Sequence, residues 1–361
     1  MAATYYCPHA PMEAFIRRSC VALGADEEVA AAVAQHLVRA NLSGHDSHGV
    51  IRMPWYAEQV KDGKLVPSAH PVLLRETPAA GLFDAQLGFG HYSTRMTTEW
   101  AVERAKQIGV AVATQRNATH IGRLGEYAER GAAAGCITLV TYGSAGKGTG
   151  IVAPFGGSER FLGTNPWTMG IPATGRLPFL YDAATSVIAE GKIRVARDKG
   201  GSLSPGAILD PQGNPSTTPA DFYAGGMLLP VGGEIAGHKG FGFSLAAAFV
   251  GGLSLSAIPA PTVGIVTERG TVVSGVTVIA IDANAFGDGA EYAERISEVL
   301  DDVTRVKPTP GTERVLAPGE PEEISRQERM RTGLPLPAAT WDALVGMADR
   351  LGIAPPEGEA E

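Results

Sequence analysis

The sequence predicts a mixed α/β fold of the α+β kind, with helical regions at both ends and a sheet between them. Apolar residues recur at helical spacing over residues 29–40, and further helices are expected at 290–303 and 338–351. The β-branched run 136–142, typical of a buried strand, lies between them. The chain has 46 glycines, yet no G-x-G-x-x-G lies between a clean strand and a helix. The sheet is therefore not predicted to be the doubly wound dinucleotide-binding type.

The first part of the chain is predicted to be helical up to residue 40. Asp26 has the side chain of an N-cap, and the apolar positions that follow lie on one helical face. Residues 62–91 are expected to form short strands and turns. A helix is predicted over 93–108, where Gly109 stops it.

The middle of the chain alternates between elements. We expect a strand at 110–114, a turn at 117–120, a helix at 122–134 and a buried strand at 136–142. Two stretches rich in Gly, Pro and short apolar runs, 152–173 and 179–200, favour strands joined by tight turns. A long polar loop is expected over 198–221.

The most apolar run, 241–266, is predicted to be a buried helix that ends near Ala257. Its glycines and prolines argue against a membrane span. His238 and Lys239 are expected to open this helix, where they either bind an anion or remain solvated. A strand at 275–281 and helices at 290–303 and 338–351 complete the prediction.

Composition excludes several kinds of partner. The chain has 361 residues, 44% hydrophobic and 19% charged, with a formal net charge of −8. This balance, without a basic patch, argues against nucleic acid. The first residues lack a secretory pattern, so a cytoplasmic protein without a membrane partner is expected. The three cysteines lie far apart and fit reduced thiols rather than a zinc site or disulfides.

A cluster of titratable residues follows the predicted N-terminal helix. Within the stretch 41–56, residues 43–48 hold two His, two Ser and one Asp, and Arg52 follows four positions later. Gly44 and Gly49 bracket the cluster and permit a tight turn. An imidazole transfers protons near neutral pH, and a guanidinium offers paired donors to a carboxylate. These residues suit a 2-oxo acid or 2-hydroxy acid enzyme.

Two other interpretations of this cluster stay open from local sequence. It is either a solvent-exposed polar turn or part of a metal site, although His45 and His48 would need further ligands that no other tight grouping supplies. The glycine-rich loop at 143–150 is similarly ambiguous. It fails the Walker pattern because Gly148 follows Lys147, and a plain surface loop is as good an interpretation as a phosphate cradle.

Five motifs in a fixed order resemble those of one enzyme family, the malate/L-lactate dehydrogenases, and within it the hydroxycarboxylate dehydrogenase B type. The resemblance extends from Phe15 to about Gly352. The motifs are ANLSGHDSHG at 40–49, THIGRLGEYAERGAAAG at 119–135, VAPFGGSERFLGTNP at 152–166, DAATSVIAEGKIRVARDKG at 182–200 and GHKGFG at 237–242, with PGEPE at 318–322.

This resemblance implies an NAD-dependent dehydrogenase, with NADP as the alternative cofactor, acting on a small 2-oxo or 2-hydroxy acid. It implies a non-Rossmann, mostly antiparallel NAD(P)-binding sheet and a homodimer with its active site at the interface. The expected regions are a helical one at 1–90 that carries the histidine loop, the central sheet domain at 91–290 and a helical one at 291–361.

The resemblance also implies individual roles. Three residues are expected to act in catalysis: His48 as proton carrier, Ser47 beside it, and His120 as a second acid/base group. Three are expected to face substrate, namely Arg52, Thr164 and Lys192. No metal ligand is implied. The cofactor is expected to contact His48, Gly122, Arg123, Leu124, Ser144, Leu180, Tyr181, Asp182, Ala183, Ala184, His238, Lys239, Gly319, Glu320, Pro321 and Glu322.

The substrate is the least defined expectation. Ureidoglycolate, sulfolactate or cyclic imino acid chemistry of the same family is one alternative, and a catalytically silent dinucleotide-binding protein is another. Lys192 stands where some imine-reducing relatives carry Asp, which argues against an imine-specific relay. Four large residues near the motifs form either an apolar substrate pocket or core: Met53, Trp55, Trp167 and Met169. Arg123 or Lys147 would favour NADP if either reached a 2′-phosphate.

Overall fold

The computed structural model describes residues 3–147, 150–198, 200–255, 265–266 and 272–360, built around one large sheet. Its strand order is β2-β3-β4-β12-β5-β6-β7, and β11 pairs with β12. Every pair is antiparallel except β3 with β4, which confirms the predicted mostly antiparallel sheet. The strands are β2 Val72–Glu76, β3 Ala80–Asp84, β4 Val110–Ala118, β5 Cys136–Gly143, β6 Trp167–Ile171, β7 Phe179–Ala183, β11 Ile265–Val266 and β12 Val272–Asp282.

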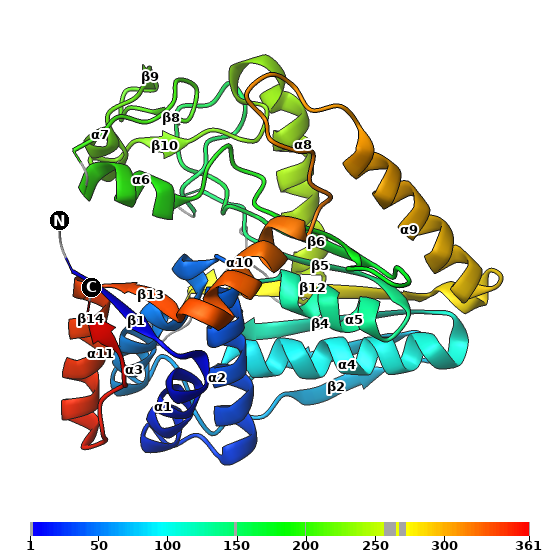
Figure 1. The fold of residues 1–361 in the computed structure, drawn as a ribbon, viewed down its shortest axis with the longest axis horizontal. Coiled ribbons are helices and arrows are strands. Elements are labelled where there is room, and N and C mark those ends of the chain that lie inside the picture. Colours follow the sequence, from blue (N-terminus) through cyan, green and yellow to red (C-terminus); the bar gives the residue numbers. More distant parts are fainter. Residues whose placement is uncertain (1–2, 148–149, 199, 256–264, 267–271, 361) are drawn as a thin grey trace.

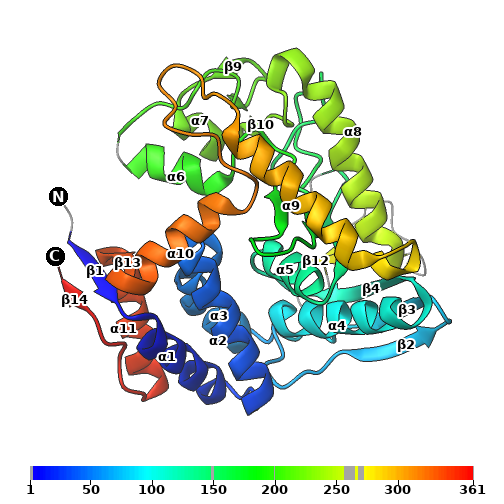
Figure 2. The same ribbon diagram turned by 45° about the vertical axis from the view of Figure 1, so that its right-hand side comes forward.

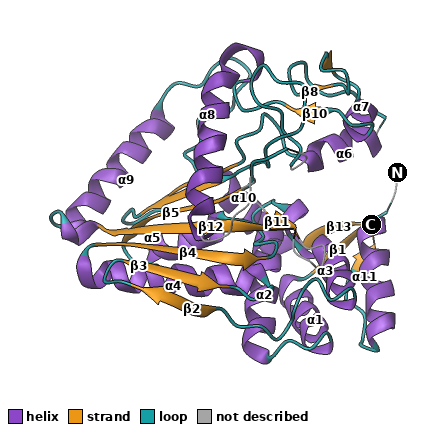
Figure 3. Cartoon of the chain, turned by 180° about the vertical axis from the view of Figure 1, so that it is seen from behind, coloured by secondary structure: helices purple, strands orange, loops and turns teal. Residues whose placement is uncertain are grey.

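Helices cover both faces of this sheet (Figures 1 and 3). Helices α4 (Gly90–Ile108) and α5 (Gly125–Ala133) lie on one face, and α8 (Gly233–Gly251) lies on the other. Two glycines permit the close approach. A Cβ on Gly131 of α5 would lie 1.8 Å from the Thr138 Oγ1, and one on Gly143 would lie 2.7 Å from the Ala248 Cα of α8. Alternate residues of β5 therefore face opposite layers.

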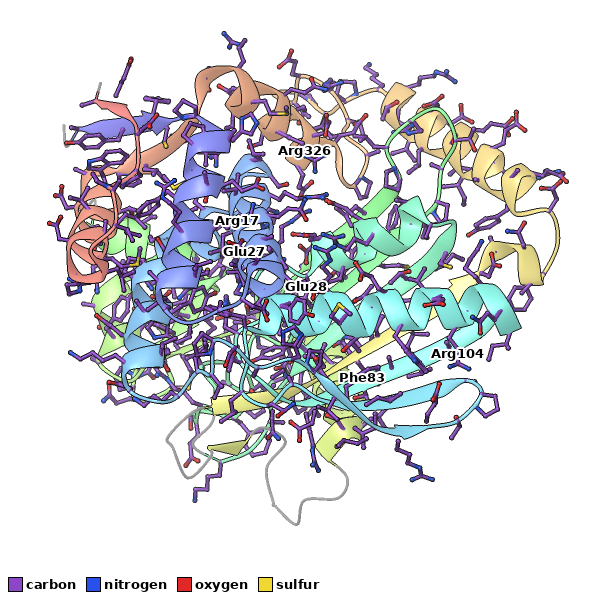
Figure 4. All side chains as sticks on the ribbon, turned by 90° about the horizontal axis from the view of Figure 1, so that it is seen from below. Arg17, Glu27, Glu28, Phe83, Arg104 and Arg326 are labelled. Carbon is purple, nitrogen blue, oxygen red and sulfur yellow. The ribbon has the colours of Figure 1, made fainter. Side chains whose placement is uncertain are left out.

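The N-terminal helices form a second core beside the sheet. Helices α1 (His9–Ala22), α2 (Glu27–Leu42), α3 (Met53–Lys61) and α11 (Ala338–Leu351) pack around fully buried side chains such as Phe15 and Leu37. The Asp26 Oδ1 accepts the Val29 N–H at 2.9 Å, which confirms the predicted cap of α2. An ion pair between Arg17 and Glu27, 2.7 Å long, links α1 to α2 (Figure 4).

The chain ends meet in a small sheet of order β13-β1-β14, formed by β13 Leu334–Pro337, β1 Thr4–Cys7 and β14 Glu359–Ala360. Between the large sheet and this end, α9 (Gly289–Arg305) leads into α10 (Glu320–Thr332), which lies against α2 (Figure 2). Strands β2 and β3 belong to the large sheet although they precede residue 90. The three-part division at 90 and 290 stays a prediction.

A third group of elements lies beyond the α8 face of the sheet. It contains α6 (Glu190–Asp198), α7 (Pro219–Tyr223) and a sheet of order β10-β8-β9, formed by Met227–Leu228, Ile208–Leu209 and Pro215–Ser216. The prediction of strands throughout 179–200 was wrong over α6. Ile193 of this helix is fully buried in a local core, and that tertiary contact favours a helix over the strand that the apolar runs indicated.

The apolar helix α8 differs from its prediction in three respects. It begins at Gly233, so His238 and Lys239 lie in its second turn, where their N–H groups are not at the helix start. It ends at Gly251 and continues as a 3₁₀ turn to Leu255; Ala257 lies outside the described residues. It is also not buried all round, because Phe249 is 60% exposed. No described helix is long and apolar enough to cross a membrane.

Candidate active site

The histidine loop consists of two 3₁₀ turns, Asp46–His48 and Val50–Arg52, between α2 and α3. Asn41, at the end of α2, holds both turns. Its Nδ2 donates to Asp46 Oδ1 at 2.7 Å, and its Oδ1 accepts the Val50 N–H at 2.8 Å. A Cβ on Gly49 would lie 2.1 Å from that Oδ1, so the fold requires glycine here. The loop is thus built for one conformation.

Helix α10 fixes the same loop from the other side. Arg329 donates to both carboxylate oxygens of Asp46, Nη1 to Oδ1 at 2.6 Å and Nη2 to Oδ2 at 3.1 Å. Such a bidentate pair is strong and directional. Asp46 therefore positions the loop, and the hydroxyl of Ser47 is the group that touches the imidazole of His48.

His48 lies with one ring nitrogen occupied and its ring against a second histidine. The Ser47 Oγ and His48 Nδ1 are 3.0 Å apart, and the rings of His48 and His120 stack at 5.6 Å with 17° between their planes. Burial, followed by the charge of Arg52, lowers the pKa of His48 from 6.5 to about 3. His48 is therefore neutral near pH 7 and can accept a proton.

Arg52 is a cation held beside these imidazoles. Its Nε donates to the Ser47 backbone oxygen at 2.6 Å. Within the described residues no carboxylate lies at ion-pair distance from it, in contrast to most arginines of the chain. Its two terminal nitrogens can thus receive a ligand carboxylate through a planar fork.

His120 is held from the side opposite its accessible edge by residues that the sequence did not single out. The Tyr56 hydroxyl, on α3, lies 2.6 Å from His120 Nδ1 and 3.1 Å from His91 Nε2. Burial lowers the pKa of both histidines well below the usual value, so both are neutral. Tyr56 follows Arg52 by four residues, one helical turn, which is the one sequence signal that would have found it.

A third buried histidine pins the segment after His120. His36 Nε2 accepts the Arg123 N–H at 2.9 Å, and its Nδ1 lies 2.9 Å from Glu126. A Cβ on Gly122 would lie 2.2 Å from His36 Nε2. The Arg123 side chain is only 2% exposed and lies 3.0 Å from Glu129, so it is turned inward. The guanidinium of Arg123 is therefore not presented to a cofactor.

The predicted cofactor segments at 122–124, 180–184 and 319–322 come together along β7. The Asp182 Oδ2 accepts the Gly125 N–H at 2.9 Å, and the Leu180 N–H donates to Pro318 at 3.2 Å. Glu322, on α10, lies 3.3 Å from His45 Nε2 of the histidine loop. Three segments far apart in sequence therefore border the loop that carries His48.

A second group of predicted residues lies toward α8. Asn165 Oδ1 accepts the Ser144 N–H at 2.9 Å, and its Nδ2 donates to the Ser244 oxygen of α8 at 3.0 Å. The backbone oxygen of Thr164 accepts from Thr185, just after β7. His238 and Lys239 are exposed on α8, and no hydrogen bond between described residues joins them to the histidine loop.

Lys192 approaches the site through its helix. A Cβ on Gly191, its neighbour in α6, would lie 3.5 Å from the Ser47 Cβ, so the first turn of α6 faces the histidine loop. Lys192 is exposed, and no ion pair within the described residues includes it. The structure thus brings the start of α6, Ser47 and Arg52 to one place.

The residues present fit a nicotinamide dinucleotide. Within the described residues β7 pairs with no strand other than β6, and Tyr181 on it is 38% exposed. The Leu180 N–H on its outer side donates to Pro318, and the other backbone groups on that side can bond an amide. The exposed cation of Lys239 suits a phosphate. Within the described residues no group of three His, Cys, Asp or Glu is arranged to hold a metal ion, and the three cysteines are buried and free.

Comparison with known proteins places the chain among oxidoreductases that use this non-Rossmann sheet. The family profile described as malate/L-lactate dehydrogenase matches residues 7–345, so the chain belongs to the malate/L-lactate dehydrogenase family, as its motifs had indicated. Dehydrogenases of this family depend on pyridine nucleotides.

Relatives and solved structures match nearly the whole chain. Hydroxycarboxylate dehydrogenase B of Escherichia coli (strain K12) is 33% identical over 344 residues, which cover 95% of this chain and 93% of the relative. A Delta(1)-pyrroline-2-carboxylate reductase of Ancylobacter novellus is 32% identical over 355 residues, 94% of this chain and 97% of the relative. The crystal structure of malate dehydrogenase from Entamoeba histolytica superposes with a TM-score of 0.89 at 26% identity, covering 98% and 100% of the two chains.

Proposed function

We propose that the protein is an NAD-dependent oxidoreductase that interconverts a 2-hydroxy acid and a 2-oxo acid. The observation that carries this proposal is Arg52, a cation without a carboxylate partner in the described structure, held beside the neutral pair of Ser47 and His48. A carboxylate clamp next to a proton acceptor suits a substrate that has its hydroxyl on the carbon adjacent to the carboxylate.

The residues divide the work as follows. Arg52 pairs with the substrate carboxylate, and the start of α6, with Lys192, closes the same side. His48 donates its Nδ1 hydrogen to the Ser47 Oγ, which leaves the Nε2 lone pair for the proton of the substrate hydroxyl. Once the substrate carboxylate neutralises Arg52, the second of the two main causes that lower the pKa of His48 is offset; burial, the larger cause, remains, so the proton is accepted more readily but still at a neutral imidazole.

When bound, the cofactor accepts or supplies the hydride at the carbon that carries the oxygen. The expected contacts are the segment 122–124, the β7 edge, the α10 start, and His238 and Lys239 of α8. We favour NAD over NADP because Arg123, one of two basic residues that would read a 2′-phosphate, is committed to Glu129. Lys147 is exposed and keeps NADP as the alternative.

The test is absorbance at the NADH band with pyruvate, phenylpyruvate and oxaloacetate, each with NADH and NADPH. We expect oxidation of NADH by at least one oxo acid. No oxidation of either cofactor with any of them would contradict the proposal and favour a catalytically silent dinucleotide-binding protein. An arm with Delta(1)-pyrroline-2-carboxylate tests imine reduction, which the cation of Lys192 disfavours because a protonated imine is itself positive.

We propose that the substrate carries an aromatic side chain, because one of the four large residues near the motifs, Trp55, is placed to contact it. Trp55 is 41% exposed and its ring lies edge-on to His120, 6.1 Å between centroids, so it can line the pocket. Met53 is fully buried in the helical core and cannot. Trp167 stacks on Phe243 of α8 at 5.2 Å. Faster turnover of phenylpyruvate than of oxaloacetate is the expected result.

We also propose a homodimer with the active site at its interface. Helices α8 and α9 expose large apolar side chains, among them Phe249 at 60% and Val299 at 59%. Val303 lies one turn from Val299 on the same face of α9. Apolar surface of this kind is usually covered in an assembly. Sedimentation equilibrium of the purified protein measures the mass, and a monomer at micromolar concentration would contradict this proposal.

A further inference from the structure

The Tyr56 hydroxyl lies between two imidazoles and has one hydrogen to give. It is 2.6 Å from His120 Nδ1 and 3.1 Å from His91 Nε2. Because all three groups are neutral, the hydroxyl donates to one histidine and accepts from the other. In one arrangement the remaining nitrogen of His120, Nε2, carries a hydrogen and is a donor. In the other it carries a lone pair and is an acceptor.

His91 decides between the two arrangements. Its Nδ1 is buried and has no hydrogen-bond partner in the described structure. If Tyr56 donated to His91 Nε2, the neutral ring would carry its hydrogen on Nδ1, as a buried N–H without an acceptor. If His91 Nε2–H donates to Tyr56, only a lone pair is left bare. Orphaned buried N–H groups are rarer than bare lone pairs, so the second arrangement is favoured.

The direction of the remaining hydrogen bond then follows. The Tyr56 oxygen accepts from His91 and its hydrogen goes to His120 Nδ1, which must be unprotonated. His120 carries its hydrogen on Nε2. The two nitrogens of an imidazole lie on opposite sides of Cε1, and Nε2 of the partly exposed His120 has no hydrogen-bond partner within the described residues. That N–H is available to a ligand.

We propose that His91 and Tyr56 are positioning residues which fix neutral His120 as an Nε2–H donor to the substrate oxygen, so that His120 polarises the carbonyl and His48 alone carries the proton. The inference rests on the proposed function and extends it. The rings of His48 and His120 stack at 5.6 Å, so a lone pair on the one and an N–H on the other lie within reach of a single ligand. A 2-hydroxyl group, which both donates and accepts, matches this pair, and a carbonyl oxygen matches the His120 N–H.

The first test reads the tautomer without substrate. Uniformly ¹⁵N-labelled protein gives distinct imidazole signals for protonated and bare nitrogens, and His120→Gln identifies those of His120. We expect a protonated Nε2 in the wild type and a mixture of both tautomers in Tyr56→Phe. Tyr92→Phe is the matched control, since it removes a tyrosine bonded to His70 at 2.9 Å and should leave the His120 signals unchanged. A wild-type His120 protonated on Nδ1, or an unaltered tautomer in Tyr56→Phe, overturns the proposal.

The second test separates positioning from folding. His91→Gln keeps an N–H donor for Tyr56, whereas His91→Leu removes it at similar volume. We expect His91→Leu to lower kcat about ten-fold, a fraction of the loss of a whole oxyanion donor, with cofactor affinity unchanged, and His91→Gln to recover most of that loss. Equal kcat in the two variants overturns the proposal even if Tyr56→Phe does not fold. If His120 is protonated on Nε2 as expected but the enzyme is inactive on every oxo acid, the proposed reaction is refuted and the proposed tautomer is not.

Discussion

The helical side of the candidate site and its sheet side differ in burial: the first holds buried imidazoles and the second an accessible surface. On the helical side, His91 and His120 are neutral, and their nitrogens are fixed by single hydrogen bonds in a buried setting. On the sheet side, β7 lies at the edge of the described sheet and α8 exposes the cation of Lys239. Proton transfer needs a fixed tautomer away from water, whereas a large, charged cofactor needs an accessible surface. The contrast predicts that substitutions on the two sides affect different kinetic constants.

The largest effect is expected for His48→Asn. If His48 is the proton carrier, this change should lower kcat by about 10² to 10⁴, the usual worth of a positioned acid/base group, and leave NADH affinity nearly unchanged. Steady-state kinetics and NADH fluorescence titration measure the two quantities. His70→Asn is the matched control, because His70 bonds Asp26 and Tyr92 away from the site. A His48→Asn enzyme with wild-type kcat would end this mechanism.

Arg52→Lys should act through the substrate. An ammonium keeps the charge but loses the planar fork, and it also releases the bond from Nε to the Ser47 oxygen. We expect KM for the oxo acid to rise about 10- to 100-fold, the worth of one or two charge-assisted hydrogen bonds, with a smaller change in kcat. An unchanged KM together with reduced NADH affinity would move Arg52 to the cofactor side.

The buried histidines make stability depend on pH. The folded pKa values of His48, His91 and His120 are lowered, to about 3 for His48, so below pH 6.5 the unfolded chain takes up protons that the folded chain does not. Well above pH 6.5 these histidines are neutral in both states and do not affect stability; as the pH falls below 6.5, each lowers the free energy of unfolding by up to about 1.4 kcal/mol per pH unit. Glu126, whose folded pKa is also lowered, keeps its contribution above its unfolded pKa and does not oppose this trend.

Urea unfolding at pH 7.5, 6.5 and 5.5 measures this slope. The free energy of unfolding should decrease over that range, and His91→Leu should show a shallower decrease, smaller by about one proton. A wild-type free energy that is constant from pH 6.5 to 5.5 would mean that the three imidazoles titrate alike in the folded and unfolded chains.

The smallest effect is expected on the sheet side. Lys239→Gln removes one exposed charge from α8, which should weaken NADH binding about two- to five-fold at low salt and leave kcat at saturating cofactor unchanged. The difference between variant and wild type should vanish at 1 M salt, because screening removes such interactions. A salt-independent difference would indicate a structural role for Lys239 in α8.

Local sequence patterns correctly predicted those elements whose ends or faces depend on interactions between residues close in sequence. The cap at Asp26, the stop at Gly109 and the helix Ala338–Leu351 were confirmed because a side-chain hydrogen bond, a positive φ or an apolar face decides each of them. The same forces place the histidine loop directly after α2. The mostly antiparallel sheet came instead from the family resemblance, and the structure confirmed it.

Contacts between distant residues could not be predicted in this way. Helix α6 depends on the burial of Ile193, and α8 begins at a glycine cap that gives no sequence signal. The bond of Tyr56 to His91 joins residues 35 apart, and no periodicity connects them. The contact of Asp46 is the clearest example, because its partner, Arg329, lies 283 positions away in the sequence. The roles assigned to individual site residues remain predictions until the variants are measured.

The clamp between Asp46 and Arg329 also orders events during translation. The histidine loop leaves the ribosome early, but the arginine that fixes it is synthesised 283 residues later. Until that point the side chains of Asn41 and Arg52 hold the two 3₁₀ turns. Since N-terminal parts fold first during synthesis, the loop that carries His48 is made early and is fixed late. A ribosome that stalls before α10 would therefore release a fragment whose histidine loop has never been held by Arg329.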